Sequence, residues 1–513
     1  MLAKTFSASV IGIDAYPVEI EVNVTGSSSG GAADSVVSIV GLPDMAVKES
    51  RDRVKSAILS SGMIPPKGFT VVNLAPADLR KEGAAFDLGI ALGMLAATGA
   101  VNPEALSSVA VVGELALDGS VRPVRGALPI AARLAEQAGL AMLLVPPQNA
   151  EEAALAGGEK LAVYPVASLT AAVELINRGG ALPYRTSLAE YTERNREHEP
   201  DFADVKGQKM ARRALEIAAA GGHNCLLTGP PGTGKSMLSM RLAGILPPMT
   251  MAETLETSRI HSVLGLLSGG RPLLNRRPFR SPHHTISDVG LIGGGRDPKP
   301  GEISLAHNGV LFLDELPEFK RNVLEVLRQP LENGWITVSR AAGTCTFPAR
   351  FILCAAMNPC PCGRGEVELG CTCKIEEKRR YQKRISGPLL DRIDLQLEVR
   401  QLSQDELLAA PDGEPSAKIR ERVIRARQLQ QERLGQRKLY CNAQLSSRDL
   451  QEFCRLSAGS QLLLRQAITR FKLSPRAYDR ILKVARTIAD LAGCVDIRDE
   501  HIFEAINYRR KEQ

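Results

Sequence analysis

The chain has 513 residues, 44% of them hydrophobic and 24% charged, and a formal net charge of +7. This composition is typical of a globular protein of several domains, and the positive charge permits a nucleic-acid partner without requiring one. One Trp and few aromatic residues argue against a surface built on base stacking. No secretory leader is recognisable, the longest apolar run (89–101) is too short to span a bilayer, and all ten cysteines lie at or after position 225. We therefore expect a cytoplasmic protein in a reducing compartment, without a membrane partner.

Residues 1–178 carry signals of both strands and helices. Residues 18–24 and 35–40 alternate as half-buried strands do, whereas residues 45–61 have helical spacing. Asp118-Gly119 is a hairpin-type turn. The pattern predicts an α/β domain with a mixed sheet.

Two segments of this domain, 81–89 and 113–126, resemble the signature segments of Lon-type proteases. In that family the first carries a nucleophilic Ser and the second a Lys that activates it. Matched position by position, the Ser falls on Asp87 and the Lys on Leu128, and these side chains cannot perform Ser–Lys acylation. The resemblance implies a Lon-protease-like (ribosomal S5 domain 2-type) domain that is not a peptidase. A shifted register that conceals a working pair is the alternative.

Residues 179–202 are polar and aperiodic, which predicts a linker. Residues 203–400 are expected to form a nucleotide-binding core. Its first segment, 205–208, resembles the one that holds adenine in AAA+ ATPases.

A glycine-rich loop at 229–236 follows the apolar run 225–227 and precedes a predicted helix. Its backbone N–H groups and the helix N-terminus are expected to surround phosphate oxygens. Lys235 would reach the β- and γ-phosphates of ATP, and Ser236 would complete a Mg²⁺ shell. A chance Gly-rich turn is the alternative, which the flanking strand and helix disfavour. The expected cofactor-binding residues are Gly229, Pro230, Pro231, Gly232, Thr233, Gly234, Lys235 and Ser236.

Two further apolar runs end in polar residues. Residues 310–313 precede Asp314 and Glu315, as in a buried parallel strand with its ligands at the carboxyl end. Asp314 would hold Mg²⁺ through water and Glu315 would orient the attacking water. Solvated acids at a strand end are the alternative. The next predicted buried strand ends in Asn358, whose amide could fix the same water.

The segment 386–394 resembles the one that supplies the arginine finger in Mg-chelatase and MCM ATPases, and 474–478 resembles their lid segment. The resemblance implies that Arg392 acts on a neighbouring subunit's γ-phosphate and that Arg476 senses γ-phosphate. A surface Arg392 paired with Asp391 or Asp394 is the alternative. The rest of 401–513 is predicted to be a helical lid of amphipathic helices.

Two insertions resemble those of the Mg-chelatase/MCM branch of AAA+ proteins. A long Gly- and Arg-rich insert, including 268–271 and Arg296, separates Lys235 from Asp314. A hairpin at 335–347, with its tip at 340–343, precedes the Asn358 strand. The resemblance implies that Arg340 contacts DNA, and a solvated charged hairpin is the alternative. His283 and His284 are expected to be loop residues rather than metal ligands, with a phosphate-facing role left open.

Cysteines gather at 360–373, where Cys360, Cys362, Cys371 and Cys373 form two Cys-x-Cys pairs. Four thiolates so close together can surround one tetrahedral Zn²⁺, although the usual pairs are Cys-x-x-Cys. Free thiols or redox pairs are the alternative. The basic cluster at 376–384 would meet phosphates or form a solvated helix face.

The chain as a whole resembles the YifB/ComM family of Mg-chelatase-like ATPases, most specifically at 229–236, 280–285, 310–315 and 386–394. The resemblance implies an α/β multidomain protein with a Lon-like front (1–178), an AAA+ P-loop core (203–400) and a lid (401–513). It also implies a homohexameric ring that hydrolyses ATP and acts on single-stranded, duplex or branched DNA. Such a helicase would promote branch migration of recombination intermediates during natural transformation, with recombination proteins as further partners. A chelatase motor for a porphyrin and an ATP-dependent protease or protein remodeller remain the alternatives.

Overall fold

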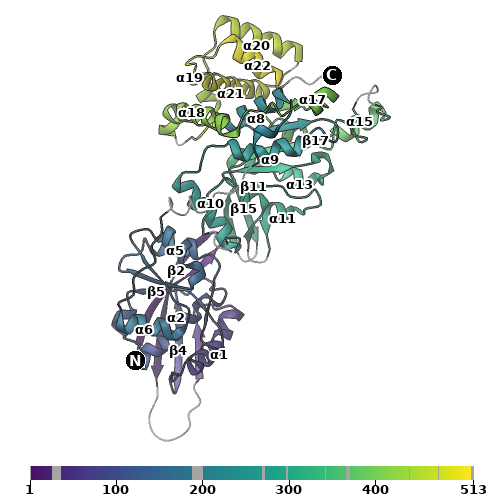
Figure 1. The fold of residues 1–513 in the computed structure, drawn as a ribbon. Helices are drawn as coiled ribbons and strands as arrows, with labels where there is room; N and C mark the ends of the chain where they lie inside the picture. The colour runs from purple at the N-terminus through teal and green to yellow at the C-terminus, as the bar shows by residue number, and fades with distance from the viewer. Residues whose placement is uncertain are drawn as a thin grey trace. The chain divides into compact units, whose positions relative to one another are not determined.

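The computed structural model describes residues 2–25, 36–187, 200–267, 272–295, 298–340, 343–365, 370–437, 439–471 and 473–509. Two compact units are present (Figure 1): Met1–Arg196 with Met251–Asn275, and Glu197–Thr250 with Arg276–Gln513. No helix in the described ranges is both long and apolar enough to cross a membrane. The insert at 268–271, Arg296, the central part of the hairpin tip and residues 188–199 of the predicted linker lie outside these ranges.

The first unit contains the mixed sheet that the sequence predicts. Its seven strands lie in the order β3-β4-β2-β1-β5-β8-β9. The pairs β1–β2 and β2–β4 are antiparallel, and the other neighbours are parallel. The strands are β1 (Leu2–Ile11), β2 (Asp14–Thr25), β3 (Val36–Val40), β4 (Phe69–Ala75), β5 (Val109–Val111), β8 (Met142–Val145) and β9 (Ala162–Pro165), with a separate hairpin of β6 (Glu114–Leu115) and β7 (Val121–Arg122).

Helix α2 (Asp87–Ala97) is buried along its whole length. Its glycines allow this close approach, because a Cβ at Gly89 or Gly93 would lie 2.7 Å from Ile20 or 2.6 Å from Val22 of β2. The other helices of residues 1–187 are α1 (Met45–Ser60), α3 (Pro103–Leu106), α4 (Ala127–Leu134), α5 (Ala150–Gly157) and α6 (Leu169–Arg178).

Helix α10 (Met251–Val263) belongs to the first unit, although the sequence predicts that it forms part of the 203–400 core. It packs against α4. The reason is an apolar cluster in which Leu128 and Leu155 contact Leu255 and Leu273. The part of the insert from Met251 to Asn275 therefore belongs to the N-terminal unit, whereas the rest of the segment up to Asp314 belongs to the second unit.

The two positions of the Lon-type dyad have different surroundings. Asp87 is buried, and its carboxylate accepts hydrogen bonds from Ser50 and from Arg53, whose Nε lies 2.9 Å away. Burial raises the pKa of Asp87, and these donors oppose the rise. Leu128 lies in the apolar cluster against Leu273.

The second unit is built on a parallel sheet in the order β11-β14-β17-β10-β18. All residues of β14 and β17 are buried, which confirms the two buried strands predicted from their apolar runs. The strands are β10 (Cys225–Thr228), β11 (Phe279–Arg280), β14 (Val310–Leu313), β17 (Ile352–Met357) and β18 (Leu395–Glu398).

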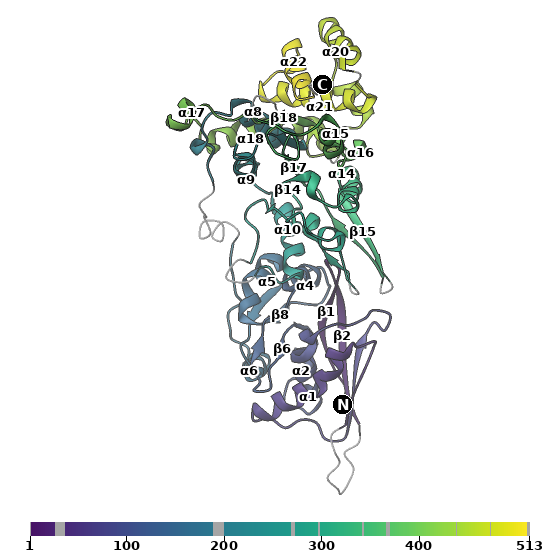
Figure 2. The same ribbon diagram turned by 90° about the vertical axis from the view of Figure 1, so that its right-hand side faces the viewer.

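Helices that precede, separate and follow these strands in the sequence share the apolar core of the sheet. The C-terminal region is helical, as predicted, and in both views of the second unit its helices gather at one end (Figures 1 and 2). The longer helices are α8 (Lys209–Gly221), α9 (Lys235–Ile245), α18 (Ser416–Leu434), α19 (Ser447–Phe453), α20 (Ala458–Phe471), α21 (Pro475–Leu491) and α22 (Asp499–Asn507). The shorter ones are α11 (Asp288–Ile292), α12 (Glu302–Leu305), α13 (Arg321–Glu325), α14 (Arg328–Asn333), α15 (Ile375–Gln382), α16 (Gly387–Leu390) and α17 (Gln404–Leu408).

The hairpin before β17 is present as two antiparallel strands, β15 (Trp335–Arg340) and β16 (Gly343–Pro348). Its register pairs Trp335 with Pro348 and Arg340 with Gly343. Residues 341–342 are outside the described ranges, as is the side chain of Arg340, so its predicted DNA contact stays a prediction.

Candidate functional site

The glycine-rich loop 229–236 leaves the carboxyl end of β10 and enters α9. Gly232 and Gly234 have φ angles of +77° and +87°, which favour glycine. Gly229 has no room for a side chain, because a Cβ there would lie 2.2 Å from the carbonyl oxygen of Val399. The three glycines of this loop are thus required by its backbone shape.

Lys235 lies inside the curve of the loop. Its Nζ donates to the carbonyl oxygens of Gly229 at 2.7 Å and Pro230 at 2.8 Å, and to Oδ1 of Asn358 at 3.3 Å. Burial lowers the pKa of Lys235, and the carboxylates of Asp314 and Glu315 oppose this shift. A phosphate group in the loop would favour the charged ammonium further.

Ser236 and Asp314 meet where β10 and β14 end. The hydroxyl of Ser236 donates to Oδ2 of Asp314 at 2.6 Å, and Oδ1 of Asp314 accepts the backbone N–H of Glu315 at 2.9 Å. A hydroxyl and a carboxylate are oxygen ligands of the kind that Mg²⁺ binds beside phosphates. These two residues fit the predicted Mg²⁺ site.

Glu315 adopts a left-handed backbone conformation (φ +52°), and its side chain is 52% exposed. Its Oε2 lies 3.4 Å from Nδ1 of His284. The sequence predicts His284 only as a loop residue and misses this contact. The only sequence signal for a role of His284 is that it lies in 280–285, one of the segments most specific to the family that the chain resembles.

A cavity of about 520 Å³ lies beside the loop. Gln208 connects the two, because its Nε2 donates to the carbonyl oxygens of Arg400 at 2.8 Å and Thr233 at 3.4 Å. Three residues of the segment predicted to hold adenine (205–208) line this cavity, which has room for a nucleoside. The lining residues are Lys206, Gly207, Gln208, Lys209, Met210, Glu398, Arg400, Glu406, Ala409, Ala410 and Asp412.

Arg392 and Arg476 differ in exposure. Arg392 is 7% exposed and donates to Glu332 and to the carbonyl oxygen of Pro388. The ion-pair partner of Arg392 is therefore Glu332, and not Asp391 or Asp394, the two alternatives considered from the sequence. Arg476 is 67% exposed, and its Nη1 lies 3.9 Å from Oδ2 of Asp391.

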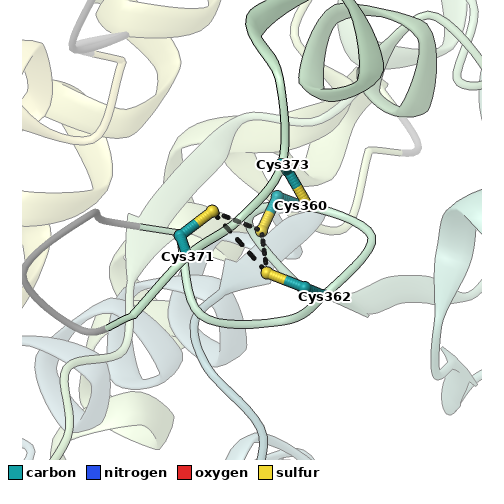
Figure 3. A group of neighbouring side chains, drawn as sticks. All are labelled: Cys360, Cys362, Cys371 and Cys373. Atoms are coloured by element: carbon teal, nitrogen blue, oxygen red, sulfur yellow. Dashed lines mark hydrogen bonds between the residues drawn. The ribbon is translucent and has the colours of Figure 1, made fainter.

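The four thiols of 360–373 converge, with every sulfur within 4.8 Å of the others (Figure 3). The Sγ–Sγ distances are 3.3 Å for Cys360–Cys362, 3.7 Å for Cys360–Cys371 and 3.6 Å for Cys362–Cys371. Tetrahedral Zn²⁺ with Zn–S bonds of about 2.3 Å places its sulfurs roughly 3.8 Å apart. Cys360 also accepts the N–H of Gly365 at 3.2 Å. The cluster is compatible with zinc.

The cysteine loop is packed against the candidate phosphate site. A Cβ at Gly363 would lie 2.8 Å from Cγ of Pro231. Helix α15 follows the loop, and its Tyr381 accepts a backbone hydrogen bond from Asn358, while burial raises the pKa of Tyr381 to about 12. The cysteine loop and the helix after it are thus in contact with residues that follow β10 and β17.

Known proteins match the chain over nearly its whole length. Three family models match it: "Magnesium chelatase, subunit ChlI" at 201–407, "Subunit ChlI of Mg-chelatase" at 20–149, and "Magnesium chelatase, subunit ChlI C-terminal" at 413–509. The chain is 45% identical to competence protein ComM of Haemophilus influenzae (99% of this chain, 97% of the relative). It is 42% identical to the uncharacterized protein YifB of Escherichia coli (99% and 97%). The magnesium-chelatase subunit ChlI of Euglena gracilis is 24% identical (31% and 52%).

Proposed function

Since this chain belongs to the YifB/ComM family of Mg-chelatase-like AAA+ ATPases, we propose that it couples ATP hydrolysis to movement on DNA. Membership of the family implies ATPase activity with ATP and Mg²⁺. The finer proposal is a helicase that promotes branch migration of recombination intermediates during natural transformation. It is supported by the 45% identity to a competence protein and by the positive net charge.

The convergence of Lys235, Ser236, Asp314 and Glu315 at one sheet edge carries the ATPase part of the proposal. Lys235 would exchange the carbonyl oxygens of Gly229 and Pro230 for phosphate oxygens. Ser236 and Asp314 would hold Mg²⁺, which neutralises charge on the β- and γ-phosphates. Glu315 would orient the attacking water, and Asn358, already bonded to Lys235, would fix that water from its amide.

We further propose a homohexameric ring with ATP between subunits. In such a ring, Arg392 would have to leave Glu332 to reach a neighbour's γ-phosphate, whereas the exposed Arg476 would give up only its 3.9 Å contact with Asp391 to approach nucleotide. Arg340, in the hairpin β15–β16, would contact DNA. The first unit would serve as a Lon-type domain without peptidase activity, because Asp87 and Leu128 occupy the dyad positions.

We also propose that the four cysteines hold a structural Zn²⁺. Their separations are close to those of a tetrahedral thiolate site. The metal would close the loop that carries Gly363, which lies against Pro231 of the phosphate loop. Its chemistry would be structural, since four protein ligands leave no open position.

A branch-migration assay on a synthetic four-way junction with one labelled arm tests this function. The wild-type protein with ATP and Mg²⁺ should release the labelled product, and Glu315→Gln should not. ATP hydrolysis without product release on any junction would instead support a protein remodeller.

A further inference from the structure

We propose that His284 is a positioning residue for Glu315, holding one carboxylate oxygen so that the other can accept the attacking water. The proposal rests on the assigned role of Glu315 in ATP hydrolysis. The proposal adds to the ATP-hydrolysis site a residue from the segment after β11, whereas Glu315 comes from the segment after β14.

Strand register explains why these two residues meet. Strands β11 and β14 are parallel neighbours, and Arg280 pairs with Leu311. Four residues beyond each member of this pair, past the ends of both strands, the chain reaches His284 and Glu315, whose Nδ1 and Oε2 atoms are 3.4 Å apart. The start of this segment is fixed as well, because Arg280 donates to both carboxylate oxygens of Glu302 at 2.7 Å.

The imidazole of His284 is supported on two sides. His283 lies against it with ring centroids 4.0 Å apart, and the Nδ1 of His283 is 2.9 Å from Oγ1 of Thr285. Phe319 meets the ring of His284 edge-on, at 6.4 Å and 78°. Phe319 is 4% exposed and ends the single turn that begins at Glu315. The same turn therefore positions both the carboxylate of Glu315 and the ring of Phe319 that packs against the imidazole of His284.

The contact suits a water-orienting carboxylate. Half of the Glu315 side chain is exposed, so without a partner it would move among several rotamers. The 3.4 Å contact of Nδ1 with Oε2 restricts the carboxylate and leaves Oε1 to accept a hydrogen bond from water. His284 acts through Glu315 and does not itself touch the reacting atoms.

Steady-state ATP hydrolysis by the full-length chain, without DNA, tests the proposal. His284→Ala should lower kcat by about tenfold to a hundredfold, the range seen when a catalytic group is slightly misplaced, with KM for ATP changed by less than about twofold. His284→Asn should recover most of the loss, because its amide nitrogen can occupy the place of Nδ1. Ser281→Ala, an exposed position on the same segment, should behave as wild type.

A double-mutant cycle separates positioning from folding. In single-turnover measurements, adding His284→Ala to Glu315→Gln should cause no further loss, because the two residues act as a unit. A His284→Ala enzyme with wild-type kcat would overturn the proposal, as would losses that add in the double variant or no recovery in His284→Asn. Normal turnover in Glu315→Gln would instead remove Glu315 from its assigned role.

Discussion

Replacing Glu152 by Gln is expected to stabilise the first unit above neutral pH. Glu152, on α5, is 7% exposed, and its carboxylate accepts hydrogen bonds from Asn149 at 2.6 Å and from Ser262 of α10 at 3.0 Å. Burial raises its pKa from the ordinary value of 4.5 to about 7. Hydrogen bonds from Asn149, Ser262 and the backbone of Leu128 oppose the rise.

The raised pKa fixes the sign of the pH dependence. Below pH 4.5 the carboxyl is protonated in both the folded and the unfolded chain, so this part of the stability is complete. As the pH rises from 4.5 to about 7, the unfolded chain releases the proton more readily and stability falls. The loss reaches about 1 kcal/mol at pH 5 and about 3 kcal/mol at pH 8. Gln cannot ionise, so Glu152→Gln does not suffer this loss. Its free energy of unfolding relative to wild type should therefore increase by about 2 kcal/mol from pH 5 to pH 8.

Calorimetry of the full-length chain can measure this gain. For a unit the size of the first one (Met1–Arg196 with Met251–Asn275), a difference of about 2 kcal/mol corresponds to a shift of roughly 4–8 °C in Tm. At each pH we compare the Tm of the first unit in Glu152→Gln with the Tm in the wild type. This difference should be larger at pH 8 than at pH 5, by roughly 4–8 °C. The exposed Glu159→Gln serves as the matched control and should show no such gain. A Glu152→Gln profile parallel to the wild-type profile would refute the reasoning.

Three further predictions concern the second unit. Glu315→Gln should bind ATP with wild-type affinity, measured with a fluorescent analogue, and lose at least about a hundredfold in kcat; undiminished turnover would contradict its role. Cys371→Ser should lose the one equivalent of zinc that elemental analysis is expected to find in the wild type, while Cys494→Ser retains it; a metal-free wild type would refute the zinc site. Arg340→Ala should leave basal ATPase intact and weaken DNA binding in a fluorescence assay, whereas the charge-matched Lys160→Ala should not. Equal DNA affinity in all three proteins would exclude the hairpin contact.

The sequence predicted the phosphate site because its residues follow simple rules of parallel sheets. Lys235, Asp314 and Asn358 each follow a buried apolar strand, and such strand ends share one edge. Local spacing also predicted the convergence of the four cysteines, since they lie within one short loop.

Contacts that depend on tertiary packing were not predictable in this way. His284 meets Glu315 only because β11 adds beside β14, and β11 has two residues that no periodicity identifies. The partner of Arg392 is Glu332, distant in sequence, instead of the neighbouring aspartates. Helix α10 follows the nucleotide loop in the chain yet packs on α4, because its Leu255 and the later Leu273 belong to one apolar cluster with Leu128.

The proposal of an ATP-driven DNA motor is tested most directly by ATP hydrolysis with and without single-stranded, duplex and four-way-junction DNA, at two salt concentrations. A motor that grips DNA phosphates should hydrolyse ATP faster when DNA is present, and this stimulation should fade as salt rises. ATP hydrolysis that is robust and indifferent to every DNA at both salt concentrations would contradict the account.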